Sequence, residues 1–287
     1  MKSFKIIEKT KIWIGISLAI MVLGLFFAIK DGFNYGIDFK GGTLVKINMK
    51  QEYDKEEVEK IVEKYTKDYT TNSAVTTSNE ILLEIRSNSL TEDQIEPMFK
   101  EIKEKYKLED KDLVSQETIG ASIGKELRQK AFIALILANI GMLIYIGIRF
   151  EFKFGLAAII ALAHDILITL AVYAIFQIPI NSSFIAAILT IVGYSINDTI
   201  VVFDRIRENG KRMRKISDTE LANISISQTL TRSINTSLTT LFTIVAVYVF
   251  VPAVRDFAIP LIIGIVSGAY SSIFIASPLW VYFRKKK

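Results

Sequence analysis

The chain contains no cysteine and a single histidine among its 287 residues. Without cysteine there is no disulfide framework, no thiol nucleophile and no cysteine-ligated metal. The lone His164 excludes a histidine-rich metal site. No nucleophile–base pair and no metal-ligand spacing occurs elsewhere, so we expect neither a cofactor nor a soluble-type enzyme.

Apolar residues make up 51% of the sequence and the mean hydropathy is +0.35, values typical of a membrane protein. The pI of about 9.1 would also suit nucleic-acid binding, but the basic residues gather at the ends of apolar runs. That placement favours the orientation of membrane helices, and we expect no nucleic-acid partner. The first apolar run lacks a small-residue cleavage site, so we expect an anchor rather than a cleaved signal peptide.

Six apolar runs are long enough to cross a bilayer, which takes roughly 17–25 helical residues each. Lysine and arginine are dense before the first run, between the second and third, after the fourth and at the end of the chain. The short loops on the other side carry only Arg255. The positive-inside rule therefore predicts a multi-pass protein of the cytoplasmic membrane with both termini in the cytoplasm. The predicted spans are residues 12–29, 131–148, 154–176, 184–203, 233–254 and 257–283.

The residues between the first two spans are predicted to form one small domain outside the cytoplasm. Their apolar residues recur at a strand period in some segments and at a helical period in others. The resulting order, β-α-β-β-α-β, is that of a ferredoxin-like fold. The predicted elements are a strand at 45–49, a helix at 58–69, strands at 71–77 and 81–85, a helix at 95–106 and a strand at 113–119.

The predicted fold class is therefore an α-helical polytopic membrane protein with one extracytoplasmic α+β domain. Residues 1–30 form the cytoplasmic N-terminus and the first span, and residues 31–130 form the α+β domain. Residues 131–287 hold the other five spans, a cytoplasmic loop at 204–227 and the cytoplasmic C-terminus.

A glycine-rich segment from Gly36 to Thr43 follows the first span. Its spacing is similar to that of a phosphate-binding loop, but Gly42 occupies the place where such a loop needs lysine. The segment also does not open a helix in a βαβ unit. We therefore expect Gly36, Gly41 and Gly42, with Asp38 among them, to form tight backbone turns.

Asp198 lies in the fourth apolar run, where an acid is costly to keep in lipid. It either marks an ion or proton path or sits near the headgroups, because the run ends at Phe203, about 7 Å further along a helix. Thr190, Tyr194 and Asn197 share a helical face with Asp198 beside them. This polar stripe favours a position against other helices or water.

Two further polar features lie in the membrane-spanning runs. His164 and Asp165 stand in the middle of the third run and serve either as hydrogen-bonding links between helices or as part of an ion path. Arg232 opens the fifth run and is either a positive-inside anchor or the partner of an acid from the fourth. In the sixth run, Gly264 and Gly268 favour close helix packing.

Asp204 and Arg205 begin the basic segment 204–227, which mixes charged and apolar residues. Three interpretations fit this composition: an interfacial helix on anionic membrane lipids, a docking surface for a partner, or a solvated charged segment. The sequence does not separate them.

Four segments resemble the signatures of the SecF family of protein-export membrane proteins, and the resemblance covers essentially the whole chain. The glycine motif is shared with SecD, whereas the long motif that contains Gly193, Asn197 and Asp198 is specific. One departure is Ala121, which stands where the family usually has proline and leaves the geometry before the second span open. The four segments are residues 33–43, 163–165, 193–208 and 229–240.

The resemblance implies a fold like half of a resistance-nodulation-division transporter. It also implies partnership with SecD and the SecYEG channel, and the use of the proton-motive force to promote export of unfolded preproteins. Asp198 and Arg232 match positions that the family uses for proton coupling, and Asp165 belongs to a signature of less certain role. The rival interpretations are a proton-driven small-molecule or lipid exporter of the same superfamily and a structural scaffold for the channel.

Overall fold

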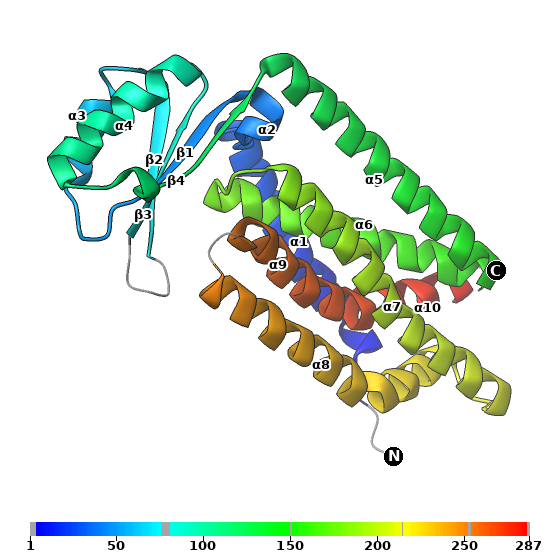
Figure 1. Ribbon diagram of the computed structural model, residues 1–287. Helices are drawn as coiled ribbons and strands as arrows, with labels where there is room; N and C mark the ends of the chain where they lie inside the picture. The colour runs from blue at the N-terminus through cyan, green and yellow to red at the C-terminus, as the bar shows by residue number, and fades with distance from the viewer. Residues whose placement is uncertain (1–3, 76–80, 150, 214, 252–253, 286–287) are drawn as a thin grey trace. The chain divides into compact units, whose positions relative to one another are not determined.

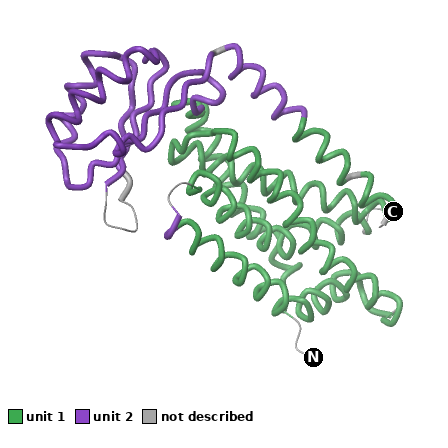
Figure 2. Tube along the Cα trace, viewed as in Figure 1, with its two compact units in different colours: residues 1–34, 134–248, 254–287 green, residues 35–133, 249–253 purple. Residues whose placement is uncertain are grey.

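The computed structural model describes residues 4–75, 81–149, 151–213, 215–251 and 254–285 (Figure 1). The chain forms two compact units, coloured separately in Figure 2. The helical unit comprises residues 1–34, 134–248 and 254–287, and the α+β unit comprises residues 35–133 and 249–253. Each unit has its own buried apolar core.

Six helices of the described chain are long and apolar enough to span a membrane, which confirms the multi-pass prediction. About half of α6 and α7 and more than half of the last span are buried, whereas α1, α5 and α8 are mostly exposed. The spans are α1 (Thr10–Lys30), α5 (Ala121–Arg149), α6 (Phe152–Phe176), α7 (Ser182–Arg212), α8 (Asp218–Phe250) and the run formed by α9 (Arg255–Ser271), a π-helical turn (Ser272–Ala276) and α10 (Ser277–Lys285).

Three of the helices extend well beyond the apolar runs. α7 continues to Arg212 and α8 begins at Asp218, so most of the segment 204–227 that joins these two spans is helical, a form that the sequence had left open. The charged residues are compatible with helix because they pair within it: Arg207 binds Asp204, and Arg205 binds Glu208, at 2.7 Å each. α5 likewise begins ten residues before the predicted span, directly after the last strand ends.

Small residues set how closely the membrane helices approach one another. A Cβ on Gly24 of α1 would lie 2.3 Å from Ala171 Cβ of α6, and one on Gly264 of α9 would lie 2.2 Å from Ile191 of α7. A Cβ on Gly268 would lie 3.1 Å from Ser195 Cβ. The close packing predicted from Gly264 and Gly268 is therefore confirmed, and its partner is α7.

The α+β unit has the predicted β-α-β-β-α-β order. Its antiparallel sheet runs β2-β3-β1-β4, the strand order of a ferredoxin-like fold. The first helix is shorter than predicted, and Tyr69, expected on it, instead begins β2. The elements are β1 (Gly42–Asn48), α3 (Lys55–Val62), β2 (Tyr69–Val75), β3 (Ile81–Ser87), α4 (Glu92–Tyr106) and β4 (Leu113–Ile119).

The glycine segment forms the tight turns predicted for it. Gly36 caps the short helix α2 (Ile37–Lys40), which contains Asp38. Gly41 and Gly42 then take φ values of 79° and 131°, in the range that favours glycine. A Cβ on Gly42 would lie 2.5 Å from the carbonyl oxygen of Ser87, so only glycine lets β1 start this close to β3.

Candidate functional site: two buried acids in the helical unit

Asp165 on α6 is fully buried and lies at the centre of a polar cluster. Three serine hydroxyls donate hydrogen bonds to its carboxylate: Ser195 of α7 at 2.6 Å, Ser267 of α9 at 2.7 Å and Ser271 of α9 at 2.8 Å. His164 Nδ1 lies 3.0 Å from Asp165 Oδ1. Both carboxylate oxygens therefore have two partners each.

His164 connects this cluster to a fourth helix. Its Nε2 atom lies 2.8 Å from the hydroxyl of Ser17 on α1, and its ring stacks on Tyr270 with centroids 6.0 Å apart. With Nδ1 donating to the carboxylate, a neutral imidazole accepts from Ser17 through Nε2. Hydrogen bonds thus join α1, α6, α7 and α9 at one level of the helical unit.

The arrangement suits an ionised carboxylate, which can only accept hydrogen bonds. Four donors around a buried acid replace the water that it would have outside the membrane. Because a serine hydroxyl also accepts, the same partners can serve a protonated Asp165 after rotation. Of the two interpretations of His164 and Asp165, the contacts directly support hydrogen-bonded links between helices.

Sequence reasoning did not identify the serines of this cluster. Ser195 lies inside the long motif of α7, and Ser267 lies between the two packing glycines of α9. In both segments the sequence drew attention to the neighbouring residues and not to the serine. Serines at positions 267 and 271 are one helical turn apart, and that spacing was the available signal.

Asp198 on α7 is also buried, with 6% of its surface exposed. In contrast to Asp165, one of its oxygens, Oδ2, has no hydrogen-bond partner among the described residues. The next residue, Thr199, bonds through its hydroxyl at 2.8 Å to Ser272, which opens the π-helical turn. Ser271 and Ser272 are adjacent, so neighbouring positions of the last span contact the Asp165 cluster and the residue beside Asp198. Asp198 is therefore buried against neighbouring helices.

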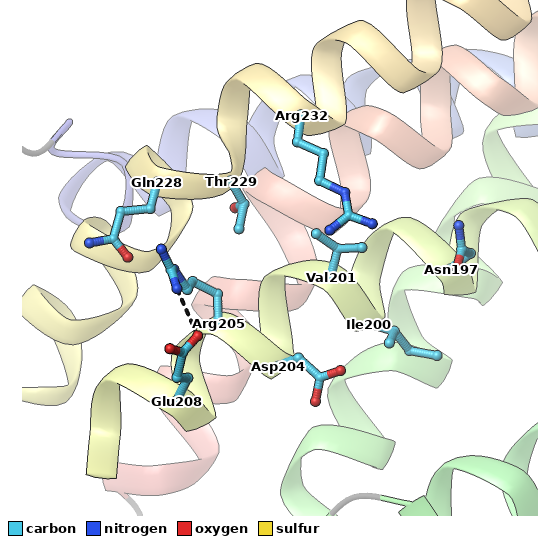
Figure 3. A pocket seen from close by; sticks show the side chains of 9 residues that line it. All are labelled: Asn197, Ile200, Val201, Asp204, Arg205, Glu208, Gln228, Thr229 and Arg232. Carbon is cyan, nitrogen blue, oxygen red and sulfur yellow. Dashed lines mark hydrogen bonds and ion pairs between the residues drawn. The ribbon is translucent and has the colours of Figure 1, made fainter. Parts of the chain in front are cut away.

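Arg232 on α8 is exposed and does not form an ion pair with Asp198 within the described part of the chain. It lines an open pocket of about 510 Å³ between α7 and α8, and Figure 3 shows its side chain reaching toward Val201. Asp198 turns inward from the same region of α7.

The other motif residues of α7 lie on the pocket side or near it. Asn197, Asp204 and Arg205 line the pocket in Figure 3, and Arg205 is bonded there to Glu208. Asn197 is exposed although the neighbouring Asp198 is buried, so the two side chains lie on different faces of α7. Successive helical residues are about 100° apart, which separates them. A Cβ on Gly193 would meet nothing within 4 Å, so no packing contact explains this glycine.

Comparison with known proteins gives a consistent family. Residues 98–286 match the family model "Protein export membrane protein SecD/SecF, C-terminal", and residues 26–52 match the "SecD/SecF GG Motif", which includes Gly41 and Gly42. The protein translocase subunit SecF of Haemophilus influenzae is 37% identical over 91% of this chain and 80% of its own length. That of Sebaldella termitidis is 36% identical over 99% of this chain and 92% of its own length.

Two solved structures are similar over nearly the whole chain. SecDF from Thermus thermophilus, described as a translocon-associated membrane protein, superposes with a TM-score of 0.83 at 34% identity and covers 99% of this chain. SecDF in a super-membrane-facing form gives a TM-score of 0.71 at 34% identity. In both cases the chain spans only 39% of the longer protein. The two relatives described above are SecF subunits, and the chain therefore belongs to the SecD/SecF family of protein export membrane proteins.

Proposed function

We propose that this chain is an accessory subunit of the Sec protein-translocation machinery. It works with SecD beside the SecYEG channel and uses the proton-motive force to promote export of unfolded preproteins across the cytoplasmic membrane. The names of its relatives support the translocation role. The positive residues at the chain ends support a cytoplasmic location of both termini, with anionic lipids nearby.

One observation carries the proton-coupling part of this proposal. Asp198 is buried in a membrane-spanning helix, and one of its oxygens has no partner among the described residues. Intramembrane acids are rare, usually face the interior of a helix bundle, and mark ion or proton paths. Asp165, by contrast, has a complete set of partners. We assign proton binding to Asp198 and helix linkage to Asp165.

The mechanism needs only binding and release of a proton, and no covalent catalysis. Arg232 and Asn197, the neighbour of Asp198, line the same open pocket between α7 and α8. A unit charge that crosses the whole field gains about 2.3 kcal/mol per 100 mV. Protonation would bias two packings of α7 against its neighbours. The change reaches the α+β unit through α5, whose first residues belong to that unit.

A second candidate function rests on an apolar pocket of about 420 Å³ beside α1, α6 and α9. Its size suits a small apolar ligand, and His164 and Ser17 lie in its wall. This observation favours the small-molecule or lipid exporter. The pocket is lined by one unit of one chain, however, and the family relatives are translocase subunits.

The test is export in a cell depleted of this chain and complemented with variants. A pulse-labelled preprotein should accumulate as precursor on depletion and be processed again with the wild-type chain. Asp198→Asn should fail to restore export although it assembles, because it cannot exchange a proton. Asp31→Asn, which changes an exposed acid at the end of α1, is the matched control and should restore export. Normal export after depletion contradicts the proposal and favours the exporter.

A further inference from the structure

Two serines of α8 are buried with nothing to bond. Ser233 and Ser237 are one helical turn apart and have 1% and 5% of their surface exposed, on a helix that is otherwise mostly exposed. Neither hydroxyl has a hydrogen-bond partner in the described part of the chain. The remaining buried side-chain oxygen without a partner there is Asp198 Oδ2.

The contacts between α7 and α8 place these three oxygens at the same level. On one side of Asp198, the Tyr194 hydroxyl lies 3.4 Å from Thr240 Oγ1. On the other side, Asn209 donates to Ser225 and to Gln228, at 2.9 Å each. Residue numbers rise along α7 as they fall along α8, so the helices are antiparallel.

Asp198 falls between these contacts, opposite the turn of α8 that carries both serines. Among the α8 side chains, Ser233 and Arg232 lie near its carboxyl group. On α6, Asp165 and His164 are hydrogen-bonded within their own cluster. On the last span, Ser272 is hydrogen-bonded to Thr199. Ser233 lies near Asp198, and Ser237 follows one turn further along α8, so these serines are the buried α8 hydroxyls without a partner at this level among the described residues.

A serine hydroxyl is both a donor and an acceptor and rotates freely. It can accept from a protonated carboxyl group and donate to an ionised one. A buried polar atom without a partner is costly, and three such atoms at one level of two antiparallel helices can be satisfied by sharing a proton. We propose that Asp198, Ser233 and Ser237 form a three-residue proton-binding site between α7 and α8, in which the serines are positioning residues.

This proposal rests on the proposed function, because it explains how Asp198 holds its proton. It also gives a role to the buried serines of α8, a helix that is otherwise mostly exposed. Ser→Ala removes one oxygen and leaves the Cβ in place, so a purely structural role of these serines predicts little change. A positioning role predicts a change in the carboxyl group itself.

The experiment compares variants of the chain reconstituted in vesicles together with SecD from the same cell. Proton uptake driven by an imposed potential is followed with a trapped pH dye. The C=O stretch of the protonated carboxyl group is followed by infrared difference spectroscopy and assigned by its loss in Asp198→Asn. The variants are Ser233→Ala/Ser237→Ala, the hydroxyl-retaining Ser233→Thr/Ser237→Thr, and Thr239→Ala as a control on the exposed face of α8.

The double alanine variant should take up protons about 10- to 100-fold more slowly, the effect of losing one or two hydrogen bonds to a charged group. A hydrogen bond to the C=O group lowers its stretching frequency. The C=O band of Asp198 should therefore move to higher frequency when the serine hydroxyls are removed. The threonine pair should retain uptake and band position, as should Thr239→Ala. If either uptake or band is unchanged in the double alanine variant, the serines do not position the proton. Normal uptake in Asp198→Asn would overturn proton coupling itself, whatever the serines do.

Discussion

Replacing Asp165 by alanine removes the carboxylate on which three serines and His164 converge. The four partners stay buried and lose their acceptor, and Ser195 and Ser271 are fully inaccessible to water. Because those partners come from α6, α7 and α9, the variant weakens the contact of three helices at once.

Hydrogen bonds between membrane helices contribute about 0.6 kcal/mol each on average and up to about 1.7 kcal/mol. Four such contacts predict that Asp165→Ala lowers the free energy of unfolding by about 2–3 kcal/mol. Asp165→Asn should cost about 1 kcal/mol or less, because its amide oxygen accepts two hydroxyls and the remaining serine can rotate to accept from its NH2 group. The comparison separates hydrogen bonding from charge.

The assay is equilibrium unfolding in bicelles, followed by the fluorescence of Trp13 and Trp280, which both lie in the helical unit. Asp31→Ala, at an exposed acid, is the matched control and should change stability by less than about 0.5 kcal/mol. An Asp165→Ala protein as stable as the wild type would refute the reasoning. Equal losses for the Asn and Ala variants would show that charge, rather than hydrogen bonding, is what matters.

Two further predictions test other parts of the molecule. Gly24→Val should separate α1 from α6 and lower thermal stability, because its Cβ would overlap Ala171. The control is Gly15→Ala, which should be neutral because a Cβ there meets nothing within 4 Å. A Gly24→Val protein as stable as the wild type would contradict this packing. In the α+β unit, burial alone would raise the pKa of Asp112, but the Lys50 ammonium at 2.7 Å and the Glu109 amide lower it below its usual value. A lowered carboxyl pKa contributes stability that is fully present above the unfolded-state value near 3.8 and is lost as the pH falls through the folded-state value. Protection of this unit against hydrogen exchange, relative to the unfolded chain at the same pH, should therefore fall below about pH 4. Asp112→Asn should remove that pH dependence, and an unchanged profile would contradict the assignment.

The architecture followed from the sequence because its signals are local and strong. Each membrane span needs a long apolar run, and nothing else in a chain of this composition produces six of them. The α+β unit followed from alternating and helical periods, and the strand predicted at 113–119 is β4 as observed. The turns at Gly41 and Gly42 followed from the backbone freedom of glycine.

The parts that could not be predicted depend on direction and on distant partners. Hydropathy ends a span at its first charges, whereas paired charges let α7 run on to Arg212. A sequence does not show that Asp198 turns inward while Asn197 turns to the pocket, because that depends on how α7 packs against α9. The serine partners of Asp165 lie 30 to 106 positions away, and no local pattern pairs them with it.

The central claim is that Asp198 carries the proton that drives export. Its most direct test is proton uptake by vesicles that contain this chain with SecD and the SecYEG channel, during translocation of a preprotein under an imposed proton gradient. The account predicts that the wild type couples the two processes and that Asp198→Asn loses both, while Asp31→Asn retains both. Coupled proton uptake and translocation in the Asp198→Asn vesicles would contradict it.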